Sequence, residues 1–286
     1  MDLELVRTLL AVVDAGTFDA AAAALHVTPS AVSQRIKALE QRTGRVLLVR
    51  ARPVRLTPSG EVIVRYGRQL LALDQDLDAA LGEDAVVRVP IAVNADSLAT
   101  WFLPALQRVS PSLRISFDLH REDQDHTTAL LRQGLVMAAV TSSREPVAGC
   151  SVTKLGEIRY AAMASQPYVD RHEDGPLKSW LPDAPVVVFD RNDDLQDRFV
   201  RTLTRGRGAS EHRHYVPSSE VYVRTIVAGL GWGMVPPQQL QDGLVDLAPG
   251  RTISVPLYWQ QWKLDSPALN AVAEAVAEEA SVALRS

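Results

Sequence analysis

Basic side chains are concentrated in one short part of this sequence, between residues 33 and 55. Seven arginines and lysines stand there with a single acid, Glu40, although the whole chain has a formal net charge of −4. Clustered cations neutralise phosphates, the main source of affinity for nucleic acids. The sequence therefore predicts a local anion-binding module attached to an acidic remainder. The basic residues are Arg35, Lys37, Arg42, Arg45, Arg50, Arg52 and Arg55.

Residues 28–44 have the spacing of a helix that could read DNA. They begin with a threonine suited to an N-cap and a proline suited to the first helical position, and they end at a glycine. Apolar residues would line one face and small or polar residues the other. On the polar face Gln34 can bond adenine edges, and Arg35 and Lys37 suit phosphates, although a solvated face is the alternative. The predicted contacts on this helix are Thr28, Pro29, Ser30, Ser33, Gln34, Arg35 and Lys37.

Neighbouring elements must position that helix. A helix is expected from residue 3 until Gly16, and a second from an N-cap at Asp19 to Leu25. A recognition helix that follows such a pair by a short turn docks in the major groove. Residues 46–50 and 55–57 predict a small two-stranded wing whose cations can lie against the backbone or the minor groove. The wing contributes Arg50, Arg52 and Arg55 to the predicted DNA contacts.

Residues 58–81 predict a long helix, again opened by a threonine and a proline. Its apolar residues alternate in steps of four and three, a short heptad seam typical of helix pairing. A helix lying on its own domain is the alternative. Two paired chains would present two recognition helices to a DNA site with two-fold symmetry. The seam consists of Tyr66, Leu70, Leu73, Leu77 and Ala80.

The run AAAALHVTPSAVSQRIKALEQRTGRVLLVR, followed by ARPVRLTPSG, resembles the winged helix-turn-helix of LysR-type regulators. Leu48 stands where the family commonly has phenylalanine, which affects only the packing of the wing. The resemblance implies double-stranded promoter DNA as a partner and pairing of linker helices in a homodimer or homotetramer. RNA polymerase is a further candidate partner.

Beyond residue 85 the pattern changes to short apolar strands that alternate with helices, and the alternation starts twice. This pattern is typical of α/β folds with right-handed crossovers and predicts two similar lobes. The expected strands are 86–93, 113–119, 135–140, 158–164, 186–189, 214–216, 233–235 and 254–262. The expected helices are 97–109, 123–133, 194–204, 218–228 and 266–284.

The predicted fold is a two-lobed α/β effector domain, preceded by an α-helical winged helix-turn-helix and a long linker helix. The effector domain resembles that of LysR-type regulators and, more distantly, periplasmic solute-binding proteins. We expect a DNA-binding domain over 1–57, a linker over 58–85, lobe I over 86–160 completed by 262–286, and lobe II over 161–261. Ligands of open α/β sheets bind beyond the carboxyl ends of the strands, which predicts a cleft between the lobes.

Two kinds of side chain recur in the loops that follow the expected strands. Hydroxyls at helix starts suit a carboxylate, and carboxylates suit a cation, although most such residues are ordinary caps and solvated acids. A ligand that needs both is a zwitterion with an extra positive charge, such as lysine or arginine. The hydroxyls are Ser97, Thr100, Thr141, Ser142, Ser218 and Ser219. The carboxylates are Asp96, Asp190, Asp193, Asp194 and Glu220.

The segments NADSLATWFLPAL, FDRNDDLQ and VPSSEVYVRTIVAGLGWGMVP resemble the branch of the family that contains the arginine and lysine exporter regulators ArgP and LysG. The resemblance implies sensing of lysine or arginine and activation of an exporter gene. Trp101 or Trp232 could close on the aliphatic stem of the ligand, and a core position is the alternative for Trp232. The predicted effector-binding residues are Asp96, Ser97, Thr100, Trp101, Thr141, Asp190, Asp194, Ser218 and Glu220.

Other functions fit the sequence less well. His212 and His214 alternate on a strand but lack a third metal ligand, and no nucleophile elbow, phosphate loop or dinucleotide fingerprint occurs. An enzyme, a metal site and a cofactor are therefore not expected. A free solute-binding protein would leave the basic module unexplained. With neither an export signal nor an 18-residue apolar stretch, we expect a cytoplasmic protein. A LysR-type regulator with a different effector, such as a neutral amino acid or an aromatic acid, stays open.

Overall fold

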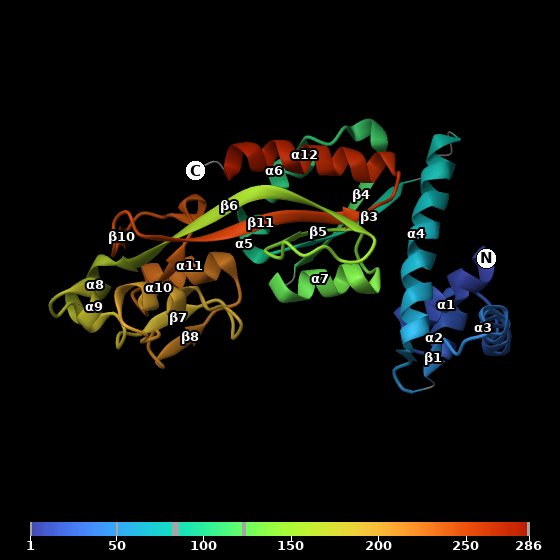
Figure 1. The fold of residues 1–286 in the computed structure, drawn as a ribbon, viewed down its shortest axis with the longest axis horizontal. Helices are drawn as coiled ribbons and strands as arrows, with labels where there is room; N and C mark the ends of the chain where they lie inside the picture. Colours follow the sequence, from blue (N-terminus) through green and yellow to red (C-terminus); the bar gives the residue numbers. More distant parts are fainter. Residues whose placement is uncertain (1, 50, 82–85, 122–123, 285–286) are drawn as a thin grey trace.

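The computed structural model describes residues 2–49, 51–81, 86–121 and 124–284. A small helical unit lies at one end, and an elongated α/β domain extends away from the long helix α4 (Figure 1). Within the described residues, no helix is both long and apolar enough to cross a membrane.

The N-terminal unit packs three helices around a core of its own. They are α1 (Leu3–Ala15), α2 (Phe18–Ala24) and α3 (Pro29–Thr43). The predicted ends at Gly16 and Gly44 are confirmed, since both glycines are left-handed C-caps. The predicted cap of the second helix is wrong. Thr17, in an extended conformation, accepts a hydrogen bond of 3.1 Å from the Ala20 amide, so that Asp19 lies inside the first turn.

The wing is shorter than predicted. Strand β1 (Leu48–Val49) pairs antiparallel with β2 (Arg55–Leu56), and α4 (Pro58–Ala80) starts directly after it. Gly60 allows the close approach of α4 to the wing, because a Cβ at this position would lie 2.0 Å from the carbonyl oxygen of Leu47. The N-cap predicted at Thr57 is confirmed by its 3.0 Å hydrogen bond from the Gly60 amide.

Helix α4 has two different long faces. Val64, Gly67 and Ala72 are buried, the first in the core of the N-terminal unit and Ala72 in that of the α/β domain. Among the described residues of α4, the opposite face exposes four large apolar side chains. They are Val62, Tyr66, Leu73 and Leu77.

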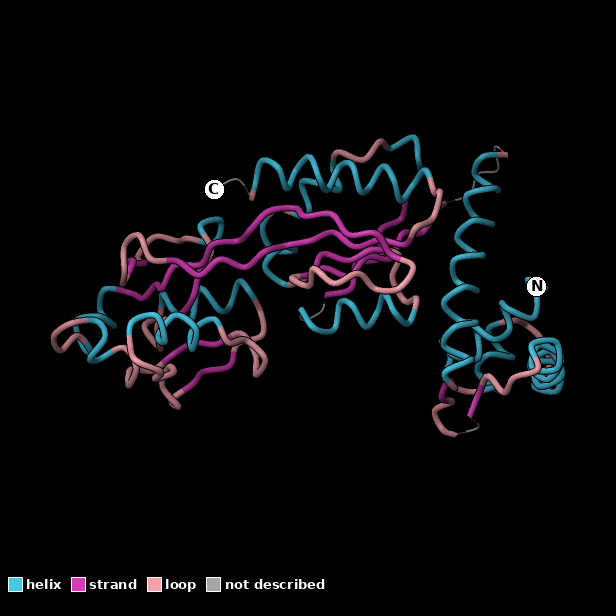
Figure 2. The backbone as a smooth tube through the Cα atoms, in the orientation of Figure 1, coloured by secondary structure: helices cyan, strands magenta, loops and turns pink. Residues whose placement is uncertain are grey.

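One long twisted sheet runs through the α/β domain in the order β10-β6-β11-β5-β3-β4, and β9 also pairs with β6. Strand β3 pairs in parallel with β4 and β5, whereas β6 and β11 run antiparallel along most of the domain (Figure 2). The strands are β3 (Val87–Val93), β4 (Ile115–Arg121), β5 (Ala138–Thr141), β6 (Cys150–Ser165), β9 (Gly233–Val235), β10 (Leu244–Asp246) and β11 (Thr252–Trp262).

The two lobes lie at opposite ends of β6 and β11. Lobe I holds β3, β4 and β5, and lobe II adds a second, parallel pair of strands, β7 (Val186–Val188) and β8 (Arg213–Tyr215). The helices of lobe I are α5 (Ala95–Thr100), α6 (Phe102–Gln107), α7 (Gln124–Gln133) and the C-terminal α12 (Pro267–Ala283), with a short 3-10 turn at Pro111–Leu113. Those of lobe II are α8 (Gln166–His172), α9 (Leu177–Trp180), α10 (Leu195–Leu203) and α11 (Ser219–Val227), with a 3-10 turn at Pro237–Gln239.

The structure corrects several predicted elements of this domain. The helix expected over 97–109 is two helices that meet at Trp101, and β6 begins at Cys150, eight residues before its predicted start. Lys154, Gly156 and Glu157 hide the beginning of β6 in the sequence, but their backbone pairs with β11. Helices α8 and α9 and strand β10 were not predicted, because each is short and lacks a clear hydrophobic period.

Candidate DNA-binding surface and effector site

Helix α3 buries one face and leaves the predicted contact face open. Val32, Ile36 and Leu39 belong to the core of the N-terminal unit. Thr28 caps the helix with a 3.2 Å hydrogen bond from the Ala31 amide. Ser33 and Arg35 are half-buried, and the other predicted contacts on this helix are exposed: Thr28, Pro29, Ser30, Gln34 and Lys37.

Arg35 is already paired within the protein. Its guanidinium forms an ion pair with Glu4 in the first turn of α1, and its side chain is only 27% exposed. Arg42, further along α3, forms a second ion pair with Asp2 at 3.2 Å. Two acids at the start of α1 therefore neutralise part of the basic cluster that the sequence presents.

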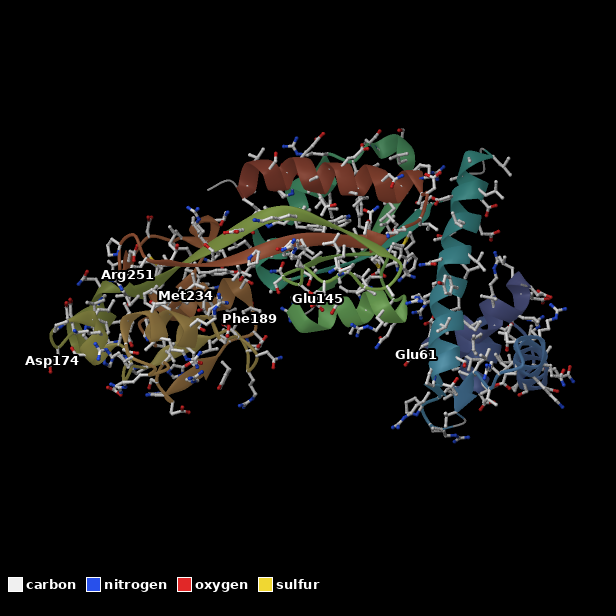
Figure 3. The ribbon with its side chains drawn as sticks, in the orientation of Figure 1. Glu61, Glu145, Asp174, Phe189, Met234 and Arg251 are labelled. Atoms are coloured by element: carbon white, nitrogen blue, oxygen red, sulfur yellow. The ribbon has the colours of Figure 1, made fainter. Side chains whose placement is uncertain are left out.

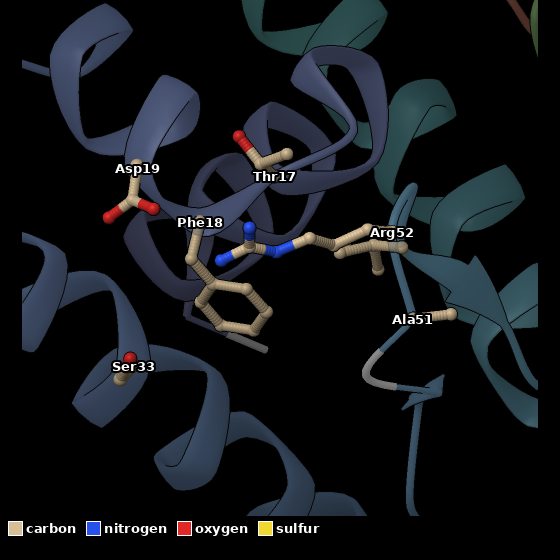
Figure 4. Close-up of a pocket in the computed structure, with 7 residues that line it drawn as sticks. Thr17, Phe18, Asp19, Ser33, Ala51 and Arg52 are labelled. Carbon is tan, nitrogen blue, oxygen red and sulfur yellow. The ribbon is translucent and has the colours of Figure 1, made fainter.

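The wing lies beside the N-terminal part of α3. Arg52 and Arg55 are exposed, and the predicted contact Arg50 lies outside the described residues. A pocket lies between the start of α2, the face of α3 and the wing; Figure 4 shows Arg52 extending toward Phe18, with Ser33 on the opposite wall. This arrangement brings a wing cation and a recognition-helix hydroxyl to the same surface. The pocket is lined by Thr17, Phe18, Asp19, Ser33, Ala51, Arg52 and Val54.

A second group of polar side chains meets where the two lobes join. Asp96, in the first turn of α5, accepts a hydrogen bond of 2.7 Å from the hydroxyl of Tyr160 on β6. Its other carboxylate oxygen lies 3.5 Å from Oγ of Ser219 on α11 and accepts a 3.4 Å hydrogen bond from Nε2 of Gln239. Asp96 therefore contacts groups of both lobes. Burial raises the pKa of Asp96, and these three hydrogen bonds oppose the rise.

Asp193, which follows β7 in lobe II, is a second acid whose charge interacts with that of Asp96. Its oxygens accept hydrogen bonds from the amides of Phe189 and Leu195, both at 3.1 Å, and from Nε2 of Gln196 at 3.2 Å. Burial raises the pKa of Asp193, and the negative charge of Asp96 raises it further. Two acids from opposite lobes are thus close enough to repel each other.

Tyr222 fixes the loop that carries Asp193. The Tyr222 hydroxyl accepts hydrogen bonds from the Met234 amide at 2.9 Å and from Nε2 of Gln196 at 3.0 Å. The hydroxyl fits because position 233 is glycine, where a Cβ would lie 2.5 Å from it. The Tyr222 ring also packs against Phe189, which Figure 3 shows in lobe II with Met234. Buried hydrogen-bonded groups of this kind hold a neighbouring side chain in one place.

Four other predicted effector residues lie in lobe I, and each side chain is either buried or hydrogen-bonded within the protein. The Ser97 side chain is buried, and its Oγ has no hydrogen-bond partner among the residues that the structure describes. Thr100 donates a 2.6 Å hydrogen bond to the Asp96 carbonyl, and Thr141 accepts one of 3.1 Å from the Ser143 amide. Trp101 is 2% exposed and packs edge-on against its neighbour Phe102, so its indole belongs to the core.

The remaining predicted effector residues lie in lobe II and are more exposed. Asp190 accepts 2.7 Å and 3.1 Å hydrogen bonds from the next amides of its loop, at Asn192 and Asp193. Asp194 and Glu220 pair with arginines four residues later on their own helices, at 3.8 Å and 3.5 Å. Ser218 is half-buried, and its side chain does not cap α11 in the described structure. The structure thus brings Asp96 to the lobe junction and leaves Asp194 and Glu220 facing solvent.

Trp232 and the histidine pair of lobe II each had two interpretations from the sequence. Trp232 is fully buried against Phe199, with ring centroids 6.0 Å apart, which is the core position. The rings of His212 and His214 lie 5.0 Å apart, but no three metal-ligating side chains come together among the described residues.

Sequence reasoning missed several groups around Asp96, namely Tyr160, Gln196, Tyr222 and Gln239. It named Asp193 as an acid suited to a cation but did not select it as a binding residue. A signal existed for Asp193 and Gln196, since both follow a predicted strand at the start of a predicted helix. Gln239 is 143 residues from Asp96 in the sequence, and no local pattern connects them.

The sequence matches two family models that together span most of the chain. Residues 3–61 match the bacterial regulatory helix-turn-helix protein of the lysR family, and residues 82–281 match the LysR substrate binding domain. The chain is a LysR-type transcriptional regulator. The predicted family, its fold class and its non-enzymatic nature are therefore confirmed.

Similar proteins place this LysR-type regulator among those of the LysG and ArgP type. It is 45% identical to the HTH-type transcriptional regulator LysG of Mycobacterium tuberculosis, over 96% of this chain and 92% of the relative. The crystal structure of ArgP from Mycobacterium tuberculosis has 44% identity and a TM-score of 0.90, covering 100% of this chain and 99% of that one. Full-length LysG from Corynebacterium glutamicum with bound effector Arg has 39% identity and a TM-score of 0.83, with 100% of both chains covered.

Proposed function

We propose that this regulator senses a basic amino acid, L-lysine or L-arginine, at the junction of its lobes and activates an amino-acid exporter gene. The observation that carries the ligand class is the pair of acids Asp96 and Asp193. Each comes from a different lobe, and the charge of one raises the pKa of the other. A cationic ligand between them would relieve this repulsion and hold the lobes together.

The other predicted residues fit a zwitterionic ligand around this centre. The Ser97 hydroxyl is buried and has no partner within the described part of the chain, so it can donate to the ligand's carboxylate, helped by Thr141 and Ser218. Asp190, Asp194 and Glu220 would form an acidic rim that attracts cations before binding. Thr100 and Trp101 would support Asp96 and Ser97 from behind. A relative at 39% identity has been solved with bound effector Arg, which supports this ligand class.

DNA binding is assigned to the exposed face of α3 and to the wing. In this proposal Gln34 and the serines read base edges, and Lys37, Arg52 and Arg55, with Arg50, contact phosphates or the minor groove. In this proposal the domains divide after residues 57, 85, 160 and 261. The protein acts in the cytoplasm as a homodimer or homotetramer and is a candidate partner of RNA polymerase. Ligand binding shifts the closure of the lobes and with it the spacing of the DNA-binding units.

Thermal unfolding against a panel of single amino acids tests the ligand. L-lysine or L-arginine at about 100 times its dissociation constant should stabilise the protein by roughly 2.7 kcal/mol, whereas L-glutamate and L-leucine should not. Asp193→Asn should abolish the shift, and Asp242→Asn, an exposed acid of lobe II, should retain it. A shift with a neutral amino acid or an aromatic acid instead would overturn the ligand while leaving the family unaffected.

A further inference from the structure

Arg68 on α4 joins three helices that belong to two domains. Its Nη2 atom forms an ion pair with Asp14 in the last turn of α1, inside the N-terminal unit. Its Nη1 atom donates a 3.2 Å hydrogen bond to the carbonyl oxygen of Gln133, the last residue of α7 in lobe I. The Arg68 side chain is only 14% exposed, and guanidinium groups with so little exposure are normally paired in this way.

The backbone is built to let α7 end against α4. Gly134 follows α7 with a φ of +73°, the left-handed conformation that glycine adopts most easily, and a Cβ there would lie 3.0 Å from the Cα of Arg65. The last carbonyl groups of a helix carry partial negative charge, so the cation of Arg68 is well placed to bind them. Arg65 adds a 3.5 Å hydrogen bond to the carbonyl of Ala148, in the loop before β6.

The start of α7 lies close to a contact between the lobes. Arg121, the last residue of β4, donates a 3.2 Å hydrogen bond to the carbonyl oxygen of Pro217, two residues before α11 of lobe II. Helix α7 begins three residues later, at Gln124. Figure 1 shows α7 extending from the side of lobe II toward α4. Helix α7 therefore extends from the side of lobe I that faces lobe II to the contact with Arg68 (Figure 1).

We propose that Arg68 is a positioning residue that sets the angle between the DNA-binding unit and the effector domain. Helix α7 belongs to lobe I, so when lobe I moves relative to the DNA-binding unit, Arg68 carries the displacement from α7 to Asp14 and α1. Helix α3 packs on α1, so the recognition helix turns with it. The positioning role is independent of which ligand binds, and only its response to L-arginine rests on the proposed function.

The test compares Arg68→Gln with Arg7→Gln in the full-length protein. Arg7 forms a 2.6 Å ion pair with Asp74 between the same two helices, α1 and α4, but this pair does not include α7. Both proteins are measured on a duplex that the wild type selects from random DNA, and on a duplex with only one half of that site. Asp14→Asn is the second variant, because it breaks the contact from the other end and keeps Arg68.

We expect Arg68→Gln to weaken binding to the whole site by about 5- to 150-fold, the usual range of coupling between sites, with half-site binding unchanged. Asp14→Asn should do the same, and Arg7→Gln should change neither. The L-arginine-dependent change in the DNA footprint should disappear in Arg68→Gln, while the thermal shift with L-arginine persists. Equal loss on both duplexes, or no loss on the whole site, would overturn the proposal. If wild type shows no thermal shift, the ligand proposal fails, yet the two duplexes still test Arg68.

Discussion

The hydroxyl of Tyr160 donates a 2.7 Å hydrogen bond to Oδ2 of Asp96, which connects the crossing strand β6 to the first turn of α5. Burial raises the pKa of both groups, and the charge of Asp96 raises that of Tyr160 further. Tyr160 therefore stays protonated and can only donate to Asp96. This bond fixes the carboxylate at the lobe junction and leaves its Oδ1 edge to Ser219, to Gln239 and, in our proposal, to a ligand.

Asp96 should reduce the stability of the unliganded protein at neutral pH. Its folded pKa lies above its ordinary value of 3.8, so the folded state binds the proton more tightly than the unfolded chain. The free energy of unfolding should therefore fall as the pH rises from about 3.8 through the raised pKa. Asp96→Asn keeps an oxygen for Tyr160 and removes the charge. We expect a higher Tm than wild type at about pH 7.5 and a flatter pH dependence, measured by thermal unfolding without ligand. A lower Tm would contradict this.

Binding of L-arginine or L-lysine should weaken as the medium becomes acidic. Asp96 and Asp193 both have raised pKa values in the free protein, and a cationic ligand requires them ionised. Affinity should be constant above both pKa values and fall below them, by up to about tenfold per pH unit for each proton taken up. Calorimetric titration between about pH 5 and pH 8 measures this, with Asp242→Asn as the matched control. A pH-independent dissociation constant would show that neither acid contacts the ligand's cation.

The local signals in the sequence locate the DNA-binding unit well, and the effector site only in part. Thr28, Gly44 and Thr57 fix helix ends through bonds within a few residues, so a local pattern is enough to find them. The effector site depends on contacts such as Asp96 with Tyr160, separated by 64 residues, and with Gln239. Neither residue type is unusual in its own segment. The strand order β6-β11-β5-β3, which no local pattern encodes, brings Asp96 and Tyr160 together.

Gly60→Ala should loosen the wing from the linker helix. The new Cβ would meet the backbone carbonyl of Leu47 at 2.0 Å, and Leu47 O also accepts a hydrogen bond from the Thr57 amide. Backbone cannot rotate away as a side chain can, so we expect a loss of about 1–3 kcal/mol in unfolding free energy and weaker DNA binding. The neighbouring change Ser59→Ala is the control for denaturant unfolding and DNA titration. Wild-type stability in Gly60→Ala would mean that the wing and α4 separate freely.

Leu77→Glu should weaken self-association without unfolding the chain. Leu77 is 55% exposed and continues the apolar face formed by Val62, Tyr66 and Leu73. A charge there costs little in one chain but opposes pairing of two such faces. Sedimentation equilibrium should show a dissociation constant raised at least about tenfold, a cost of about 1.4 kcal/mol. Gln75→Glu adds the same charge at an exposed polar position of α4 and should leave association unchanged. An unchanged dissociation constant for Leu77→Glu would locate the interface elsewhere.

Gln34→Ala and Lys37→Ala should weaken DNA binding in two different ways. Both side chains are exposed on α3, so neither change should affect folding. If Gln34 bonds base edges, its loss should cost about 1–3 kcal/mol on the preferred duplex and little on others, which relaxes sequence preference. If Lys37 contacts phosphate, its loss should weaken all sequences alike and lower the slope of log affinity against log salt by about one. Titrations at several salt concentrations separate the two, with Lys178→Ala in lobe II as the control for lost charge. The slope reports how many counterions are released when protein cations contact phosphates. An unchanged slope in Lys37→Ala would therefore show that the Lys37 ammonium does not contact the DNA backbone.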